Sequence, residues 1–302
     1  MNYKKIVKSQ RLRHNILKLL SFIPDETMLR LQYRIKFGRW PDFKNPKRYT
    51  EKIQLYKLKY RNPVLHTCVD KYRVKEYIKG KNLNINVPEL YGVYDNANLI
   101  DFKTLPEKFV IKTNDGGGGN NVIVCSDKNN IEWNETVEKL NSWLNIKDIN
   151  PGREWAYTGI PRSVIMIEEL LENKKNPEAG IEDFKFFCFN GEPFFIQHDG
   201  DRLTDHRKNY YDLNWNNLHL RTDYDNFEQE APRPKQLDEM ANLARQLSKD
   251  FPHVRVDFYN IEGKIYFGEL TFYPYSGYVK FTPDEFDLKL GEQFDISSFM
   301  PR

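Results

Sequence analysis

The sequence lacks any long apolar run and is poor in cysteine. Charged residues interrupt every stretch that approaches the roughly 18 to 20 residues needed to cross a bilayer. They also interrupt the first 20 residues, where a signal peptide would lie. We therefore expect a cytoplasmic protein. The three cysteines are odd in number and widely spaced, which argues against a disulfide framework or a zinc site and favours reduced thiols in a core.

Residues for nucleophilic catalysis and for nucleic-acid binding are also missing. The six histidines are scattered, and they form no recognisable Ser/His/Asp or Cys/His set. No nucleic-acid-binding motif accompanies the basic residues, so we expect no nucleic-acid partner.

The chain is instead rich in aromatic residues and uneven in charge. Its 302 residues include 18 Tyr and 20 Phe, which suits one large or two medium globular domains. Residues 1–80 hold 21 Lys and Arg against 6 Asp and Glu, a net charge of +15. Because the whole chain carries +3, the remaining 222 residues carry −12. The basic section predicts contact with an anionic membrane, a nucleotide sugar or a charged glycan, with a solvated helical face as the alternative.

Two regions follow one another along the chain. Residues 1–80 predict a helical region, beginning with a basic amphipathic helix at 3–22 that could rest on a membrane surface. Residues 81–302 predict a second domain made mainly of short strands. Further helices are expected at 25–37, 50–60, 70–79, 131–143 and 236–249, and strands at 87–94, 109–112, 121–125, 164–171, 184–189, 193–197, 254–259 and 264–271.

The stretch at 109–124 reads FVIKTNDGGGGNNVIV, a strand with one lysine, four consecutive glycines and a second strand. Glycines let backbone N–H groups approach phosphate oxygens closely. Lys112 shares a strand face with Val110 and Asn114, so it can point at whatever the loop covers. The lysine precedes the glycines and no GK[ST] follows them, which excludes a Walker A motif. A flexible hairpin tip is the alternative.

Acidic and basic residues share one face of a predicted hairpin. Arg255 and Asp257 face the same way in VRVDFY, and Glu269 shares a face with Thr271 in the partner strand. If the strands pair, the carboxylates of Asp257 and Glu269 lie close together and repel unless a cation joins them. Magnesium is the natural candidate, since it prefers oxygen ligands. A surface salt bridge to Arg255 is the alternative.

Two other strands carry charge among apolar residues. In EDFKFFCF, Asp183 and Lys185 share one face, where the lysine requires an anion unless the strand is an exposed edge. IEELL ends a buried strand with Glu168 and Glu169, which is typical of a linker beside a flat aromatic ring.

In this order, these features resemble the ATP-grasp superfamily and, more narrowly, its TupA-like family of polysaccharide synthesis. The resemblance implies an α+β ATP-grasp fold, in which two α+β subdomains grip ATP between antiparallel sheets, behind the basic helical region. It places a flap subdomain at about 107–165 and a metal-site subdomain at about 166–302. The matching stretches span most of the chain: LPEKFVIKTNDGGGG, REW at 153–155, MIEELL, DFKFFCFNGEPFFIQ, YDLNW at 211–215 and VRVDFYNIEGKIYFGELTFYPYSG.

The resemblance implies ATP as a cofactor and assigns residues to it. Lys112 would contact the α- and β-phosphates, and Asp183 with Lys185 would lie beside the nucleotide or an acyl phosphate. The glycine loop would close over the β- and γ-phosphates, although the superfamily leads us to expect a serine within it. The loop residues are Gly116, Gly117, Gly118 and Gly119, and the adenine hinge would be Glu168, Glu169 and Leu171.

The resemblance also implies Mg²⁺ and catalytic roles. Asp257 and Glu269 would bind the metal, and Arg255 and Lys185 would act on the transferred phosphoryl group. Thr271 stands where many members carry a third metal ligand, usually asparagine, and it could coordinate through its hydroxyl.

The activity implied is that of an ATP-dependent carboxylate–amine ligase with an acyl-phosphate intermediate, joining an amino acid to a uronic acid of a cell-surface polysaccharide or its precursor. In the segment QHDGDRLTDHR at 197–207, we expect Arg202 to anchor an acceptor carboxylate and His198 to contact substrate. An ordinary polar loop is the alternative there. For the whole protein, the alternatives are a sugar kinase and a non-catalytic glycan-binding protein with a degenerate ATP site.

Overall fold

The structure is a computed structural model that describes residues 20–117, 121–145, 150, 152–174 and 176–300. The helix expected at 3–22 therefore lies almost entirely outside the described residues. Leu20–Phe22 form a short 3₁₀ turn. Among the helices of the described residues, none is long and apolar enough to cross a bilayer.

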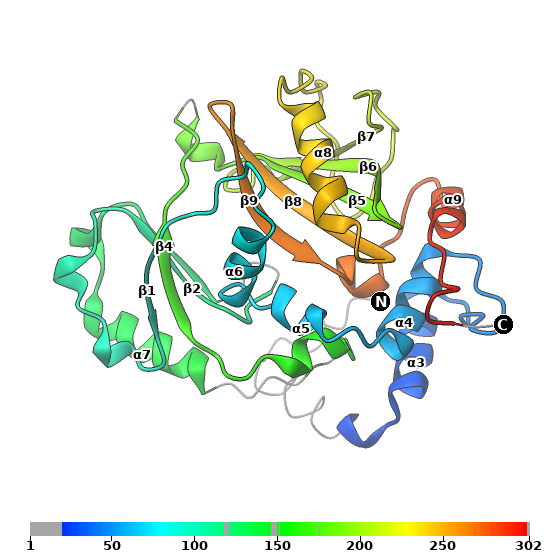
Figure 1. Ribbon diagram of the computed structural model, residues 1–302, viewed down its shortest axis with the longest axis horizontal. Coiled ribbons are helices and arrows are strands. Elements are labelled where there is room, and N and C mark those ends of the chain that lie inside the picture. Colours follow the sequence, from blue (N-terminus) through cyan, green and yellow to red (C-terminus); the bar gives the residue numbers. More distant parts are fainter. Residues whose placement is uncertain (1–19, 118–120, 146–149, 151, 175, 301–302) are drawn as a thin grey trace.

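The described chain forms two antiparallel sheets with helices packed against them (Figure 1). One sheet has the strand order β1-β4-β2-β3 and the other β7-β6-β5-β8-β9. The helices are α3 (Asp25–Phe37), α4 (Tyr49–Lys59), α5 (Val64–Cys68), α6 (Arg73–Gly80), α7 (Trp133–Leu144), α8 (Leu237–Ser248) and α9 (Glu285–Gln293). The strands are β1 (Leu90–Tyr94), β2 (Phe109–Thr113), β3 (Val122–Cys125), β4 (Ile165–Glu169), β5 (Asp183–Phe189), β6 (Glu192–Gly200), β7 (Arg207–Tyr211), β8 (His253–Ile261) and β9 (Lys264–Thr271).

Most of these elements match the sequence expectations within a few residues, whereas α5, β7 and α9 were not predicted. The β5–β6 hairpin turns at Asn190 and Gly191 with φ of 51° and 83°, the positive values that a type I′ turn requires. The small sheet combines β2 and β3 with β1 and β4. It thus draws on residues on both sides of the flap segment expected at 107–165.

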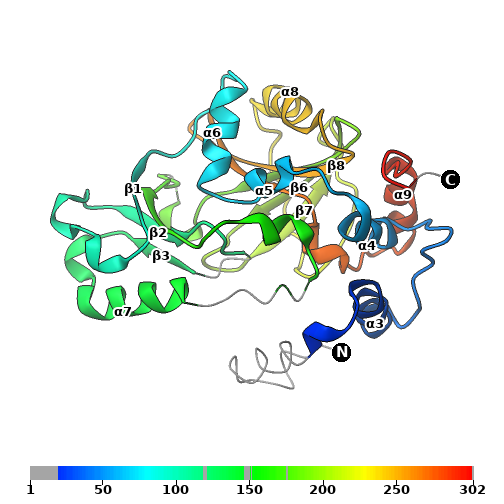
Figure 2. The same cartoon turned by 60° about the horizontal axis from the view of Figure 1, so that its bottom comes forward.

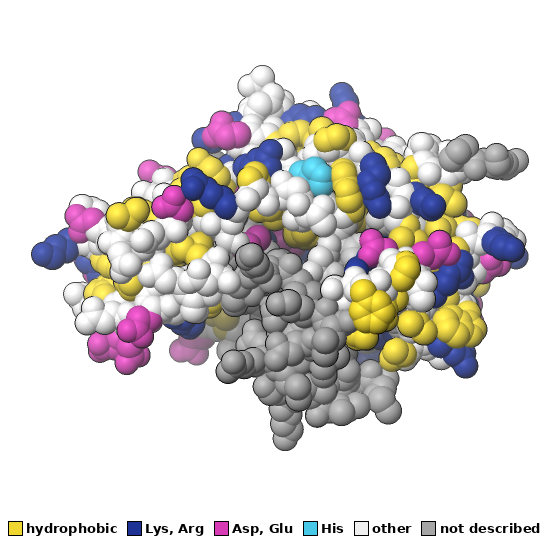
Figure 3. Space-filling model, turned by 90° about the horizontal axis from the view of Figure 1, so that it is seen from below, with side chains coloured by type: hydrophobic (Ala, Val, Ile, Leu, Met, Phe, Trp, Pro, Cys, Tyr) yellow, Lys and Arg dark blue, Asp and Glu magenta, His cyan; other side chains and the backbone are white. Residues whose placement is uncertain are grey.

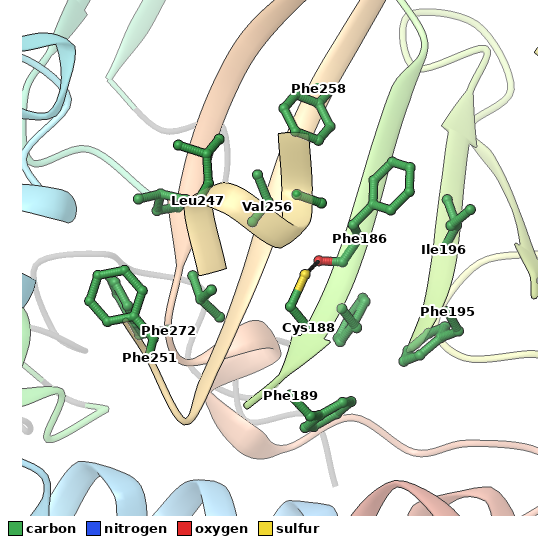
Figure 4. Close-up of a cluster of buried hydrophobic side chains, with 14 of the residues drawn as sticks. Phe186, Cys188, Phe189, Phe195, Ile196, Leu247, Phe251, Val256, Phe258 and Phe272 are labelled. Carbon is green, nitrogen blue, oxygen red and sulfur yellow. Dashed lines mark hydrogen bonds between the residues drawn. The ribbon is translucent and has the colours of Figure 1, made fainter. Parts of the chain in front are cut away.

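The five-stranded sheet has one apolar face, which α8 covers (Figure 2). Phe186 of β5 and Val256 of β8 are cross-strand partners on this face. Leu247 of α8 belongs to the same buried cluster, as the close-up shows (Figure 4). The apolar residues of α8 recur at helical spacing and those of the strands at every second position, so the two surfaces match.

The opposite face of this sheet changes character along its length. At the end near α4, Phe189 and His253 are cross-strand partners, and the rings of Tyr49 and Phe294 pack against both. The His253 Nδ1–H donates to the Cys188 carbonyl at 2.9 Å, and its Nε2 lies 3.0 Å from the Tyr49 hydroxyl. Helices α4, α5 and α6 therefore share one hydrophobic core with the strands of the large sheet. The other end of the face is charged and is described below.

The small sheet is also covered on one face. Phe109 and Ile111 of β2 pack with Leu140 of α7, which lies beneath the sheet in Figure 2. Strand alternation turns the side chain of Lys112 to the opposite face, the one that α6 approaches. Each sheet thus has one face buried by a helix, and its opposite face carries charged groups over part of its length.

Candidate active site

The β8–β9 pairing places two carboxylates opposite one another, as the sequence predicted. Asp257 and Glu269 are cross-strand partners, and so are Arg255 and Thr271. The Arg255 guanidinium donates to Asp257 at 2.7 Å through two nitrogens, to Glu269 at 2.9 Å and to the Thr271 hydroxyl at 3.1 Å. Arg255 is 8 % exposed and Asp257 2 %. The salt bridge considered as an alternative is therefore present, but it is buried instead of lying on the surface.

Burial and charge act against one another in this hairpin. Burial raises the pKa of Asp257 to about 6, and the charges of Arg255 and Lys185 oppose this shift without cancelling it. Burial alone would lower the pKa of Arg255, but the carboxylates of Asp257 and Glu269 outweigh burial and raise it. Burial alone would raise the pKa of Glu269, but the charges of Arg255, Lys71 and Lys185 outweigh burial and lower it. Glu269 is half-buried, so it combines a strong cationic surrounding with access from solvent.

Lys185 occupies the centre of the charged end of the face. Its ammonium lies 3.0 Å from Asp183, 3.5 Å from Asp257 and 3.6 Å from Asp199. Burial alone would lower the pKa of Lys185, but these three carboxylates raise it, so the lysine keeps its charge. Arg202 contacts Asp183 and remains partly exposed. The structure thus brings Asp183, Lys185, Arg202 and Asp257 together.

A second set of charges lies on the polar face of the small sheet. Glu168 is buried and pairs with Lys112, and it lies 2.9 Å from the Lys75 ammonium. Burial alone would raise the pKa of Glu168, but the two lysines lower it. The two lysines therefore hold the Glu168 carboxylate, which is not free to contact the adenine base of a nucleotide.

The rest of the expected hinge lies at the end of β4. The Glu169 carboxylate accepts from the backbone N–H of Glu89 at 3.2 Å. Leu171 follows the strand and is half-buried. Any hinge at this position is thus formed by backbone groups.

Sequence reasoning missed Lys71, which lies between the two charged sets. Its ammonium donates to the Gly116 carbonyl, and its backbone N–H donates to the Asn114 carbonyl at 2.9 Å. Burial lowers the pKa of Lys71, the Glu269 carboxylate opposes this, and the like charge of Lys112 lowers it further. Lys71 therefore contacts the glycine loop, and its pKa is affected by the Glu269 carboxylate of the large sheet. No local pattern marked this lysine, because its partner Gly116 lies 45 residues away in the sequence.

The glycine loop is described only in part. Gly116 and Gly117 belong to the described residues, whereas Gly118 and Gly119 lie outside them. The described half of the loop is connected to Lys71 through the Gly116 carbonyl.

The structure does not bring His198 to the charged end of the sheet. Side chains alternate along β6, so Gln197 and Asp199 face Lys185 and His198 faces the opposite way. His198 is buried between the rings of Phe184 and Phe227, with ring centroids 5.0 and 5.3 Å away. His206 is the histidine near the charged residues, with its Nε2 3.5 Å from Asp199.

The donors proposed for a metal fit magnesium in chemistry. Asp257, Glu269 and Thr271 offer only oxygen atoms, which Mg²⁺ prefers. Within the described part of the chain, no group of three or more His, Cys, Asp or Glu could hold a metal. Magnesium commonly uses one or two carboxylates and completes its shell with water and phosphates, so a two-carboxylate site suits a metal that arrives with a nucleotide. Arg255 contacts the same carboxylates.

A family model described as TupA-like ATPgrasp matches residues 51–295. No protein of curated function matches the sequence. Two similar solved structures are D-alanine–D-alanine ligases. The one from Bacillus anthracis is 19 % identical with a TM-score of 0.42, covering 68 % of this chain and 57 % of that chain. The one from Helicobacter pylori is 18 % identical with a TM-score of 0.43, covering 78 % and 61 %.

A third similar structure is an ADP complex of purK, N5-carboxyaminoimidazole ribonucleotide synthetase. It is 14 % identical with a TM-score of 0.40, covering 76 % of this chain and 52 % of that chain. The chain thus spans less than two thirds of the length of each of these three proteins.

Proposed function

The chain belongs to the TupA-like ATP-grasp family, whose model matches residues 51–295, and from this premise we propose that it is an ATP-dependent carboxylate–amine ligase. The expected α+β ATP-grasp fold is confirmed by the same match and by the two antiparallel sheets. One observation carries the proposal. Lys71 donates to the glycine loop at Gly116, and the charges of Lys112 and Glu269 both act on its pKa, which supports one region shared by the two charged sets.

Each charged set has a role in binding ATP. Lys112 and Lys71 supply positive charge beside the glycine loop, where the phosphates of ATP would lie. Lys185 and Arg255 supply it on the large sheet, where charge develops on the transferred phosphoryl group. In the structure, Lys112, Lys185 and Arg255 pair with carboxylates of the protein, and bound ATP would compete for these cations. Phosphate oxygens would then replace part of these contacts.

The proposed reaction has two steps. A substrate carboxylate oxygen attacks the γ-phosphorus of ATP, ADP leaves, and an acyl phosphate forms. An amine nitrogen then attacks the acyl carbon, phosphate leaves, the nitrogen loses one proton, and an amide remains. Mg²⁺ bound through Asp257 and Glu269 would neutralise phosphate charge. The side chains of Lys185 and Arg255 position and neutralise the phosphoryl group, so no protein nucleophile is required.

We further propose that the carboxylate belongs to a uronic acid of a cell-surface polysaccharide or its precursor, and that the amine is an amino acid. The family's association with polysaccharide synthesis supports this substrate class. The test is to incubate the protein and MgATP with a panel of uronic acids and amino acids, using uronates labelled with ¹⁸O in the carboxylate. A ligase transfers one ¹⁸O atom to the released phosphate and requires both substrates.

Other outcomes of this test separate the alternatives. A kinase leaves phosphate on the sugar without any amine and releases no labelled phosphate. A degenerate ATP site gives no turnover and no Mg²⁺-dependent protection of the protein by ATP against thermal unfolding. Either result would overturn the ligase proposal.

We also propose that the basic region 1–80 touches an anionic membrane surface or glycan from the cytoplasmic side. Large apolar side chains on and around α3 are exposed, with Phe22 at 82 %, Ile35 at 64 % and Trp40 at 58 %. Figure 3 shows hydrophobic side chains next to Lys and Arg side chains on the right of the face seen there. Apolar side chains together with basic residues favour binding to an anionic interface.

Sedimentation with vesicles tests this contact. We expect the protein to sediment with phosphatidylglycerol vesicles more than with phosphatidylcholine vesicles. The double variant Ile35→Ser/Trp40→Ser should sediment less, and so should a protein lacking residues 1–20, with ATP turnover unchanged in both. Equal sedimentation of the wild type with both lipids would rule out the membrane.

A further inference from the structure

A buried lysine on the edge strand β7 lies close to the charged end of the sheet. Lys208 is 4 % exposed. Its ammonium lies 2.8 Å from the Asp223 carboxylate and 3.3 Å from the Tyr275 hydroxyl. The ring centroids of Tyr224 and Tyr275 lie 4.4 and 5.1 Å from the same ammonium. Two aromatic rings and one carboxylate thus surround a cation that none of the steps described above uses.

Polar contacts connect Lys208 to Lys185. Lys208 is the cross-strand partner of Asp199, and Asp199 lies 3.6 Å from the Lys185 ammonium. Gln197 donates to Asp199 at 2.6 Å and accepts from the Tyr275 hydroxyl at 2.7 Å. The Asp199 carboxylate would therefore lie between a group bound at Lys208 and Lys185, the lysine proposed to contact the phosphoryl group.

The partner of Lys208 can be exchanged. The Asp223 side chain is about half exposed, so water can solvate its carboxylate when another anion takes its place. The Asp223 carboxylate therefore competes with any anionic ligand for the Lys208 ammonium. A fully buried carboxylate in its place could not leave without a large desolvation cost for the lysine. The distance of 2.8 Å shows that the position beside Lys208 accepts a carboxylate.

The same position offers an aromatic surface. Tyr224 is 42 % exposed, and the His206 ring packs against it with a centroid distance of 4.0 Å. Tyr275 has a φ of 54°, a left-handed conformation that is rare for a bulky residue and is often found at ligand sites. Aromatic rings with a few placed polar groups are typical of small-molecule sites.

We propose that Lys208, Tyr224, Tyr275 and His206 form the subsite for the acidic sugar. The sugar carboxylate takes the place of Asp223 on the Lys208 ammonium, and the sugar ring stacks on the exposed part of Tyr224. This inference rests on the proposed ligase function and names the contacts of its carboxylate substrate.

The test measures binding of D-glucuronate and D-galacturonate by calorimetry without nucleotide, with D-glucose and D-galactose as uncharged probes. We expect uronates to bind the wild type at least ten-fold more tightly than the neutral sugars. Lys208→Met and Tyr224→Ala should each weaken uronate binding at least ten-fold. Asp223→Asn should strengthen it, because it removes the competing carboxylate. Arg221→Gln removes an exposed charge from the same loop and should change nothing.

MgADP affinity is measured in parallel and separates the two proposals. Unchanged MgADP affinity in Lys208→Met, together with lost uronate binding, supports the subsite. Uronate binding that is insensitive to Lys208→Met, Tyr224→Ala and Asp223→Asn overturns it, whether or not MgADP binds. If glycine or glutamate binds through Lys208 and uronates do not, the subsite is not a sugar site. If the wild type does not bind MgADP, the ligase proposal is overturned instead.

Discussion

The two ends of one face of the five-stranded sheet are built on the same strands and differ in what meets them. At one end, Phe189 and His253 pack beneath Tyr49 of α4. At the other end, Lys185 and Asp257 lie side by side and pair with further charges. Both ends obey the same alternation of side chains, so alternation alone does not decide their use. At the end that α4 covers with Tyr49, the side chains form a hydrophobic core. At the end where buried charges pair with one another, an anion or a cation can bind.

The sharpest way to break this comparison is to neutralise the charged end. Asp257→Asn keeps the shape of the side chain but removes a proposed metal ligand and the carboxylate that Arg255 and Lys185 contact. We expect ATP-dependent turnover to fall about a thousand-fold or more. Turnover would be measured with the substrate pair from the uronate and amino-acid screen, and circular dichroism would check the fold.

Two further variants support this measurement. Glu269→Gln, at a half-buried position, should cause a similar loss with less risk to folding. Asp238 is an exposed residue of α8, the helix that covers the opposite face of the sheet, so Asp238→Asn should leave turnover unchanged. Normal turnover in both Asp257→Asn and Glu269→Gln would remove the metal-site hypothesis.

The aromatic end should respond in stability and not in chemistry. Phe189→Ala removes a ring that packs against Tyr49, His253 and Phe294, and we expect the free energy of unfolding to fall by about 3 to 5 kcal/mol. Urea titration measures the loss, and MgADP affinity of the folded variant should not change. Phe22→Ala, at an exposed position, should change stability by less than about 0.5 kcal/mol. A Phe189→Ala variant of normal stability would contradict the assignment of this end as core.

The lysines of the small sheet should affect nucleotide binding. Lys112→Met and Lys71→Met each remove a cation near the glycine loop, and we expect MgADP affinity to fall about 10- to 100-fold, as for other charge-assisted contacts to phosphate. Lys108→Met removes an exposed cation just before β2 and serves as the control. Calorimetry gives the affinities. If both Lys112→Met and Lys71→Met bind MgADP as tightly as the wild type, the nucleotide does not bind beside the glycine loop.

The aromatic end should also make the protein sensitive to acid. Burial lowers the pKa of His253 to about 3, whereas in the unfolded chain it is about 6.5. Between these values the unfolded chain binds a proton that the folded chain does not, so stability falls as the pH falls below 6.5. At pH 5 this contributes about 2 kcal/mol of lost stability.

Urea titration between pH 7.5 and 5 measures this effect. His253→Gln should show a smaller loss over that range than the wild type, even if it is less stable throughout. His219→Gln, at an exposed position, should keep the wild-type slope. Equal slopes for all three proteins would show that His253 is not the source.

The sequence allowed the large-sheet site to be predicted better than its surroundings. The alternation of VRVDFY placed Arg255 and Asp257 on one face, and that of GELTF placed Glu269 and Thr271 on one face. Their pairing also depends on a register shift between Asp257 and Phe258, without which Asp257 would lie opposite Gly268. The same alternation should have excluded His198, which lies between Gln197 and Asp199 on the strand and so faces away from both. Lys71 and Lys208 were missed because their partners come from other segments. Gly116 lies 45 residues from Lys71, and Tyr275 lies 67 residues from Lys208.

The dependence of nucleotide binding on magnesium is the decisive measurement. Calorimetry would compare a non-hydrolysable ATP analogue with and without Mg²⁺ for the wild type, Asp257→Asn and Glu269→Gln. We predict that Mg²⁺ tightens binding at least ten-fold in the wild type and has little effect in the two variants, with similar affinities for all three proteins in its absence. An equal response to Mg²⁺ in all three would show that these carboxylates do not hold the metal that accompanies the nucleotide.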